Sequence, residues 1–487
     1  MKLTVCIISL FQIILLSTAV SAQTATKEKA GYKIDVTIDG YASDKVFLGF
    51  RRADKVYSKD TTTFINGKYV FEGQEALPPG IYLILMPPEN KFFEFVVTKA
   101  EQHFSVETKA PDFYKNLKIK GSKDNNLLLE YQQYMSSKVE ESKQLQEQMA
   151  AETDEKKKDK LKKQLDEIGK AVRERQNKYI KENPGTYTAK LIAAFQDPEI
   201  PEAPKNPDGS IDSSFQFRYF RSHFWDGFDF SDEIFVNTPY LKEKTDRFLD
   251  KMTLQSADSV SAAAEWLVEK SRANTDVFKY LLPYLLNKYY TPEIMGLDAV
   301  FVHLSDKYYK SGIADWVTPE NLKKITDDAY MNKNVLIGKQ APDVKLQRYD
   351  PVQDKFTTEL ISPYDVQAEY TVIFLWKPGC GHCKHMSDEL IPFYEEWKSK
   401  GVEIFSISSA NHTELEEAVK NIHEKKMPWI VTADPYTRAR ALQLFYGTSL
   451  PKLYLLDKNK KFIANRVGVK QLPEIIENHK RVMAKQK

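Results

Sequence analysis

Two cysteines separated by two residues, Cys380 and Cys383, are the side chains of this chain best suited to chemistry. They follow an apolar run at 371–376 and a turn at 377–379. Thiol–disulfide exchange needs this order of strand, tight turn and Cys-x-x-Cys, because unpaired N–H groups at a helix N-terminus favour a thiolate at the first cysteine. The second cysteine, one helical turn further on, can then resolve a mixed disulfide.

The residue between the cysteines, His382, can add positive charge, further lower the pKa of the Cys380 thiol and make the pair a better oxidant. A metal site of Cys380, Cys383 and His385 is an alternative, but zinc usually takes four ligands and no second Cys/His cluster is evident. Haem attachment requires His directly after the second cysteine, where Lys384 stands. We therefore expect neither a metal nor a cofactor.

The first residues have the pattern of a secretory signal peptide. Lys2 supplies positive charge, 3–16 is an apolar core, and small residues at 20–22 suit cleavage after Ala22. An uncleaved anchor is the alternative, although the apolar core is short for a membrane span. We therefore expect residues 1–22 to be a signal peptide that directs export of the chain. No later stretch is a continuous apolar 18-mer, so we expect no membrane span in the mature chain.

Cleavage would remove Cys6 and leave Cys380 and Cys383 as the only cysteines. An exported protein with one closely spaced pair has no structural disulfide framework, which favours a redox role. The formal net charge of +2 gives no reason to expect a nucleic-acid partner.

At 487 residues the chain should form two to four domains. Strand-like alternation and an Asn66-Gly67 hairpin signal predict an antiparallel, sandwich-like β domain at 23–120. Helical spacing of apolar residues predicts a helical hairpin at 121–185 that turns near 151–154, followed by an α-helical region at 186–334. Alternating strands and helices predict an α/β domain at 335–487. Its expected strands are 371–376, 402–408, 453–456 and 462–467, and its expected helices are 380–399, 413–424, 436–446 and 471–484.

The segment 215–235 is dense in Phe, Tyr and Trp. These side chains could line a ligand pocket, but an aromatic stripe in a helical segment is more often core, and we favour the core interpretation.

The last third of the chain resembles the TlpA/ResA branch of the thioredoxin family. The resemblance rests on an opening Ile-Gly-Lys-Gln-Ala-Pro-Asp at 337–343, on Phe-Leu-Trp at 374–376 before Cys-Gly-His-Cys-Lys at 380–384, and on Ser-Leu-Pro at 449–451. It implies a C-terminal α/β thioredoxin fold. The preceding β and helical regions are similar to accessory regions of Gram-negative envelope proteins, which implies a location in the periplasm or cell envelope.

The resemblance also implies a substrate groove shaped by Pro451 after a cis peptide bond, with Gly379 and Trp376 nearby. The Gly381-His382 dipeptide matches protein disulfide isomerases and implies a less reducing potential than that of thioredoxin.

Two departures from the family pattern concern proton transfer to the second cysteine. The family often has a buried acid six residues before the first cysteine, where this chain has Phe374, or a Glu three residues after the second, where it has Met386. Glu389 is a conceivable substitute. Gly379 stands where a Trp is usual, which implies a more open groove rim.

These features together predict an exported thiol–disulfide oxidoreductase of the cell envelope. Cys380 would form the mixed disulfide and Cys383 would resolve it, with protein thiols and disulfides as substrates and a further redox partner recycling the pair. The alternative is a binding or scaffold protein whose thioredoxin fold is redox-idle.

Overall fold

The computed structural model describes residues 31–41, 43–205 and 207–485. The predicted signal peptide therefore lies outside the described residues. The described chain divides into two compact units. The first contains the described residues up to Gly49 with Ser58–Pro78 and Leu83–Asn126, and the second contains Phe50–Tyr57, Pro79–Tyr82 and the chain from Leu127 onward. Within the described residues, no helix is both long enough and apolar enough to span a bilayer.

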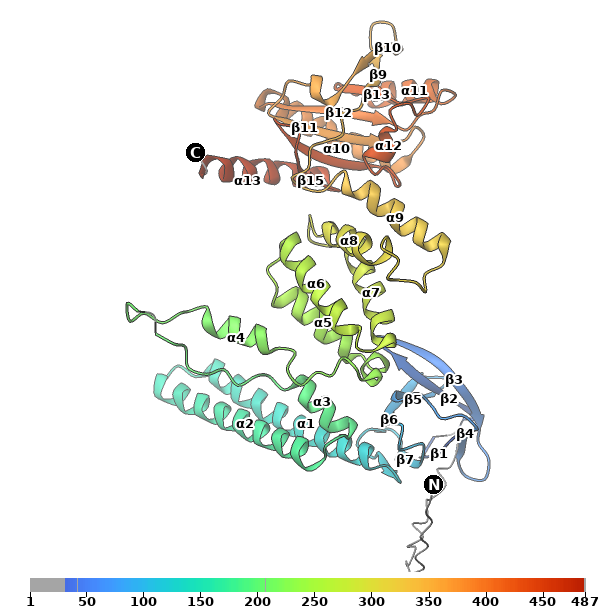
Figure 1. Cartoon of the computed structure of the whole chain (residues 1–487), viewed down its shortest axis with the longest axis vertical. Helices are drawn as coiled ribbons and strands as arrows, with labels where there is room; N and C mark the ends of the chain where they lie inside the picture. The colour runs from blue at the N-terminus through green and yellow to red at the C-terminus, as the bar shows by residue number, and fades with distance from the viewer. Residues whose placement is uncertain (1–30, 42, 206, 486–487) are drawn as a thin grey trace, which may run out of the picture. The chain divides into compact units, whose positions relative to one another are not determined.

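The N-terminal strands form two four-stranded sheets, with strand orders β4-β1-β7-β8 and β3-β2-β5-β6 (Figure 1). Burial alternates along β1, where Ile34 and Val36 are fully buried. The alternation of apolar and polar residues in the sequence thus reflects one buried and one more exposed face of the strand. The predicted antiparallel β architecture of the N-terminal region is confirmed, with one addition: β1 pairs with β7 in parallel, whereas its pairing with β4 is antiparallel. The strands are β1 Tyr32–Asp39, β2 Lys45–Arg52, β3 Lys55–Thr63, β4 Tyr69–Gly73, β5 Gly80–Met86, β6 Lys91–Val97, β7 His103–Lys109 and β8 Lys118–Lys120.

The Asn66-Gly67 turn forms as expected, because both residues have positive φ (50° and 82°) and Ile65 and Lys68 pair across it. The turn does not extend a ladder, however. It carries the chain from β3 in one sheet to β4 in the other.

The predicted helical hairpin is formed by α1 (Lys123–Ala151) and α2 (Glu155–Glu182). Asp154 caps α2, since its carboxylate accepts hydrogen bonds from the backbone N–H groups of Lys156 and Lys157. This cap explains why the turn falls where the sequence indicates.

The rest of the central region is helical (Figure 1). Its helices are α3 Tyr187–Phe195, α4 Phe215–His223, η1 Glu233–Asn237, α5 Tyr240–Lys251, α6 Ala257–Ser271, α7 Thr275–Tyr290, α8 Asp298–Leu304, η2 Ser305–Tyr309 and α9 Pro319–Lys333.

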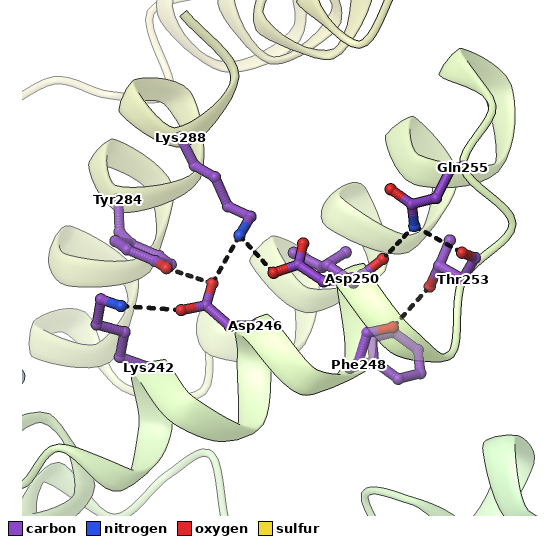
Figure 2. A network of polar contacts seen from close by, with 9 residues as sticks. Lys242, Asp246, Phe248, Asp250, Thr253, Gln255, Tyr284 and Lys288 are labelled. Carbon is purple, nitrogen blue, oxygen red and sulfur yellow. Dashed lines mark hydrogen bonds and ion pairs between the residues drawn. The ribbon is translucent and has the colours of Figure 1, made fainter. Parts of the chain in front are cut away.

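A half-buried polar network joins α5 to α7 (Figure 2). The Asp246 carboxylate accepts hydrogen bonds from the Tyr284 hydroxyl and from the ammonium groups of Lys242 and Lys288, each ammonium at 2.9 Å. Lys288 also donates to Asp250 at 2.9 Å. Burial opposes the ionised form, but these donors outweigh it and lower the pKa of Asp246.

The C-terminal region forms a seven-stranded sheet of order β10-β9-β13-β12-β11-β14-β15 with helices on its faces, as the thioredoxin resemblance implies. The interior strand β11 is parallel to β12 and antiparallel to β14. Its elements are β9 Leu346–Asp350, β10 Lys355–Ile361, η3 Pro363–Asp365, β11 Tyr370–Trp376, α10 Gly381–Trp397, η4 Lys398–Lys400, β12 Val402–Ser408, α11 Leu415–Lys425, β13 Ile430–Ala433, α12 Ala441–Leu444, β14 Lys452–Asp457, β15 Phe462–Asn465, η5 Val469–Gln471 and α13 Leu472–Lys485.

One expected helix of this region is much shorter than the sequence indicates. The pattern predicts a helix at 436–446, but α12 is confined to Ala441–Leu444. Thr437, Arg440 and Tyr446 all have left-handed backbone conformations (φ 51–53°), which interrupt a right-handed helix on both sides.

We expect Asp246→Asn to lower the free energy of unfolding of the helical region by about 2 kcal/mol, because charge-assisted hydrogen bonds from three donors are weakened at a half-buried site. Hydrogen exchange of α5 and α7 amides in the full chain measures this. The difference from wild type should shrink as pH falls, since the wild-type carboxylate loses its charge as pH drops through a depressed pKa.

The matched control is Asp327→Asn, because Asp327 forms an ion pair with the exposed Lys323 one helical turn away on α9. A solvent-exposed pair contributes little, so that variant should differ from wild type by less than about 0.5 kcal/mol. Equal effects of the two substitutions would contradict a stabilising role for the α5–α7 network.

Candidate functional site

The strand β11 brings the cysteine pair to the end of the central sheet. All seven of its residues are buried: Val372, Phe374 and Trp376 pack on one face together with Cys383, and Ile373 and Leu375 pack on the other. The chain then turns at Gly379, which has φ +70°, and α10 begins.

Cys380 is the N-cap residue of α10, as the sequence indicates. Its Sγ accepts a hydrogen bond from the backbone N–H of Cys383 at 3.4 Å, and the side chain is partly exposed. Partial burial alone would raise the pKa of the Cys380 thiol. Hydrogen bonds from the Cys383 thiol and from the backbone N–H groups of Cys383 and His382, with the charge of Lys377, outweigh burial and lower this pKa.

Cys383 has the opposite environment. It is 2% exposed, and its Sγ accepts a hydrogen bond from the backbone N–H of Lys377 at 3.4 Å. Burial, followed by the hydrogen bond to Cys380, raises the pKa of the Cys383 thiol to about 12. Both cysteines are free thiols in this structure. One thiol is thus prepared for ionisation, and its neighbour is held protonated.

The side chain of His382 is exposed at the start of α10. The group of His382 that lowers the pKa of the Cys380 thiol is its backbone N–H, which the helix start supplies regardless of the side chain. The role predicted for the imidazole therefore stays a prediction.

Apolar side chains occupy the places where an acid would assist Cys383. Phe374 is fully buried in the same cluster as Cys383, and Met386 packs against that cluster. Glu389 is directed elsewhere, with its carboxylate 3.9 Å from the Lys470 ammonium. Burial, the Cys380 thiol and backbone N–H groups determine the pKa of Cys383, and no carboxylate contributes to it.

The three residues expected around a substrate groove differ in accessibility. The peptide bond between Leu450 and Pro451 is cis, as expected, and pairing of Leu375 with Lys452 places Pro451 at the cysteine end of β11. Trp376, by contrast, is only 1% exposed. Its indole belongs to the core behind the cysteines, because the strand alternation turns it inward, and a role of Trp376 in a substrate groove stays a prediction.

Gly379 is exposed, but the space above it is partly taken by a side chain that sequence reasoning did not identify. A Cβ added to Gly379 would lie 2.6 Å from Oε1 of Glu417, a residue of α11. No pattern in the sequence connects two positions so far apart. The second group that was missed is Lys377, whose backbone N–H and charge act on the two thiols. Its position beside the motif was the available signal.

Among the residues that the structure describes, no group of three or more His, Cys, Asp or Glu side chains is placed to hold a metal ion. His385 is exposed and does not join the cysteines in such a group.

Comparison with family models divides the chain into three matches. Residues 32–128 match a domain of unknown function, DUF4369, and residues 134–333 match another, DUF5106. Residues 337–464 match the AhpC/TSA family.

Individual relatives match different shares of the chain. The thiol-disulfide oxidoreductase ResA of Oceanobacillus iheyensis is 31% identical over 77 residues, which are 16% of this chain and 38% of that relative's length. A domain of a possible thiol-disulfide isomerase from Cytophaga hutchinsonii is 30% identical and covers 31% of this chain and 97% of its own, with a TM-score of 0.27. A thioredoxin-like protein from Bacteroides caccae is 17% identical and covers 58% of this chain and 99% of its own, with a TM-score of 0.44.

The matched segment contains the cysteine pair at the N-terminus of α10, the cis-proline before β14 and most of the seven-stranded sheet. Residues 337–464 therefore belong to the AhpC/TSA family of thioredoxin-fold proteins, and two domains of unknown function precede them in this chain.

Proposed function

We propose that this protein is an exported thiol–disulfide oxidoreductase that exchanges disulfides with proteins of the cell envelope through Cys380 and Cys383. The observation that carries the proposal is the opposite environment of the two thiols. Cys380 is partly exposed with a lowered pKa, whereas Cys383 is buried with a pKa raised to about 12. Exchange chemistry requires this difference, because only the exposed thiolate can reach a partner disulfide.

In the reductive direction, the Cys380 thiolate attacks one sulfur of a partner disulfide. A bond forms between Cys380 Sγ and that sulfur, the partner's S–S bond breaks, and the second partner sulfur leaves as a thiolate that takes up a proton. Cys383 then loses its proton and attacks Cys380 Sγ, which forms the intramolecular disulfide and releases the first partner sulfur. The partner disulfide is reduced and the cysteine pair is oxidised, so a second redox partner must return the pair to dithiol. The reverse sequence oxidises a partner dithiol.

Export to the periplasm or cell envelope is the second part of the proposal. It is supported by the charged, apolar and small-residue segments at 1–22 and by the absence of other cysteines after the predicted cleavage. The β domain at 23–120, the hairpin at 121–185 and the helical region at 186–334 would then accompany the thioredoxin domain at 335–487 in the envelope.

The pKa of Cys380 should depend on the group at position 383. We expect a pKa below the ordinary cysteine value in Cys383→Ser, because the serine hydroxyl can still donate to the Cys380 thiolate. Cys383→Ala removes that donor, so its Cys380 should titrate at a higher pKa and react more slowly with iodoacetamide at neutral pH. Thiolate absorbance and alkylation rate, both followed against pH, measure the difference. Identical titrations in the two variants would exclude the side-chain hydrogen bond as a cause.

Trapping of partners tests the exchange reaction itself. Cys383→Ser should accumulate mixed disulfides through Cys380, visible as a ladder on non-reducing gels of envelope extracts, because the resolving attack is lost. Cys380→Ser should trap few or none, since Cys383 is 2% exposed. If neither variant forms adducts and the wild type neither reduces nor oxidises a test disulfide, the protein is instead a redox-idle scaffold.

A further inference from the structure

A carboxylate from α11 lies against the residue that precedes Cys380. A Cβ added to Gly379 would lie 2.6 Å from Oε1 of Glu417, so this carboxylate occupies space that a side chain at position 379 would otherwise fill. Gly379 is exposed and belongs to the turn between β11 and α10. A partner whose disulfide reaches Cys380 has to approach this turn, so the charge of Glu417 lies beside its path.

The position of Glu417 is a property of the fold, because α11 is anchored next to it. Ala418, the following residue, is fully buried in the apolar cluster that contains Cys383. The Glu417 backbone carbonyl also accepts a hydrogen bond from the side-chain amide of Asn421 at 2.7 Å. The approach of the carboxylate to Gly379 therefore depends on helix packing and not on a loose loop.

The Glu417 carboxylate is left without a counter-charge inside the part of the chain that the structure describes. It forms no hydrogen bond or ion pair there, and its side chain is exposed. Glu424, about two helical turns further along the same side of α11, differs, because its carboxylate lies 2.8 Å from the Lys384 ammonium on α10. The charge of Glu417 is thus available to a molecule that approaches Cys380.

An available carboxylate beside a reacting sulfur sorts partners by charge. It attracts a cationic group next to the attacked disulfide and repels an anionic one, and salt screens both effects. Lys377 is exposed at the same turn with the opposite charge, so neutralising Glu417 would leave the turn cationic. We propose that Glu417 makes exchange at Cys380 selective for partner disulfides that are flanked by basic residues. The selectivity rests on the proposed function and adds to it the class of partner segment that the site prefers.

The test uses three small symmetrical disulfides that differ in charge at neutral pH: cystamine is cationic, dithiodipropionate is anionic and hydroxyethyl disulfide is neutral. Each is reduced to two thiols while the Cys380–Cys383 pair of the reduced full chain is oxidised. Acid quenching, alkylation and mass spectrometry of the peptide that carries the pair give the rate constant. Each charged disulfide is expressed relative to the neutral one, which cancels any change in the reactivity of the thiol itself.

Glu417→Gln should lower the relative rate constant for cystamine and raise that for dithiodipropionate. The ratio of the two should fall about three- to tenfold at about 0.1 M ionic strength, because a unit charge near the attacked bond is removed. The fall should shrink below about 1.5-fold at about 1 M salt, where the Debye length is about 3 Å. A fall that salt does not reduce would contradict selection by charge.

The matched control is Glu369→Gln, which removes the same charge from an exposed glutamate that also lies against a glycine. A Cβ added to Gly401 would lie 3.1 Å from Cγ of Glu369. Glu369 precedes β11, however, and the seven residues of that strand separate it from the cysteines by about 20 Å, which is beyond the Debye length of about 10 Å at 0.1 M salt. This variant should react as the wild type does with all three disulfides.

An unchanged ratio in Glu417→Gln, or an equal shift in Glu369→Gln, would overturn the selectivity. So would a change by the same factor for all three disulfides, because Glu417 would then act on the structure of the site and not on the partner. These outcomes leave the oxidoreductase standing, since all of them require exchange to occur. A wild-type chain that none of the three disulfides oxidises would instead remove the proposed function, and the selectivity with it.

Discussion

The packing of α10 against the buried strand β11 is the constraint on which the chemistry of this chain depends. This packing places Cys383 in an apolar cluster with Phe374 and Trp376, and it leaves Cys380 at the first turn, where backbone N–H groups are unpaired. As a result, the pKa of the Cys380 thiol is lowered and that of the Cys383 thiol, one helical turn away, is raised. Hydrogen bonds at the helix start and the charge of Lys377 act on Cys380, whereas burial is the largest influence on Cys383.

Much of the fold could be predicted because local signals and tertiary packing agree. The hairpin of α1 and α2 is marked by helical periodicity and by a strong N-cap at Asp154, and β11 is marked by a continuous apolar run. Sheet membership is not local: Asn66-Gly67 specifies a turn, but nothing in it specifies that the turn joins two sheets. The sequence analysis did not predict β9, β10 or β13. The strand β10 has an irregular, mostly exposed pattern, and β13 has four residues.

Features of the site that follow from short sequence motifs could be predicted, whereas contacts between distant segments could not. Cys380, Cys383 and the cis bond before Pro451 are in the expected places, because each follows from a motif a few residues long. The inward direction of Trp376 follows from strand alternation, which the motif alone does not report. The approach of Glu417 to Gly379 joins α11 to the turn before α10, so it depends on how the helices pack.

The apolar surroundings of Cys383 have a consequence for timing in the proposed reaction. Phe374 and Met386 stand where an acid is usual, Glu389 lies beside Lys470, and no described carboxylate is among the groups that shift the pKa of Cys383. In the proposed reaction the proton would then pass to water or to the partner sulfur freed as a thiolate in the first step. The lifetime of the covalent complex would follow the basicity of that sulfur, so partners would be discriminated when they are released and not when they are captured. A long-lived complex also gives a tethered polypeptide time to refold before it leaves.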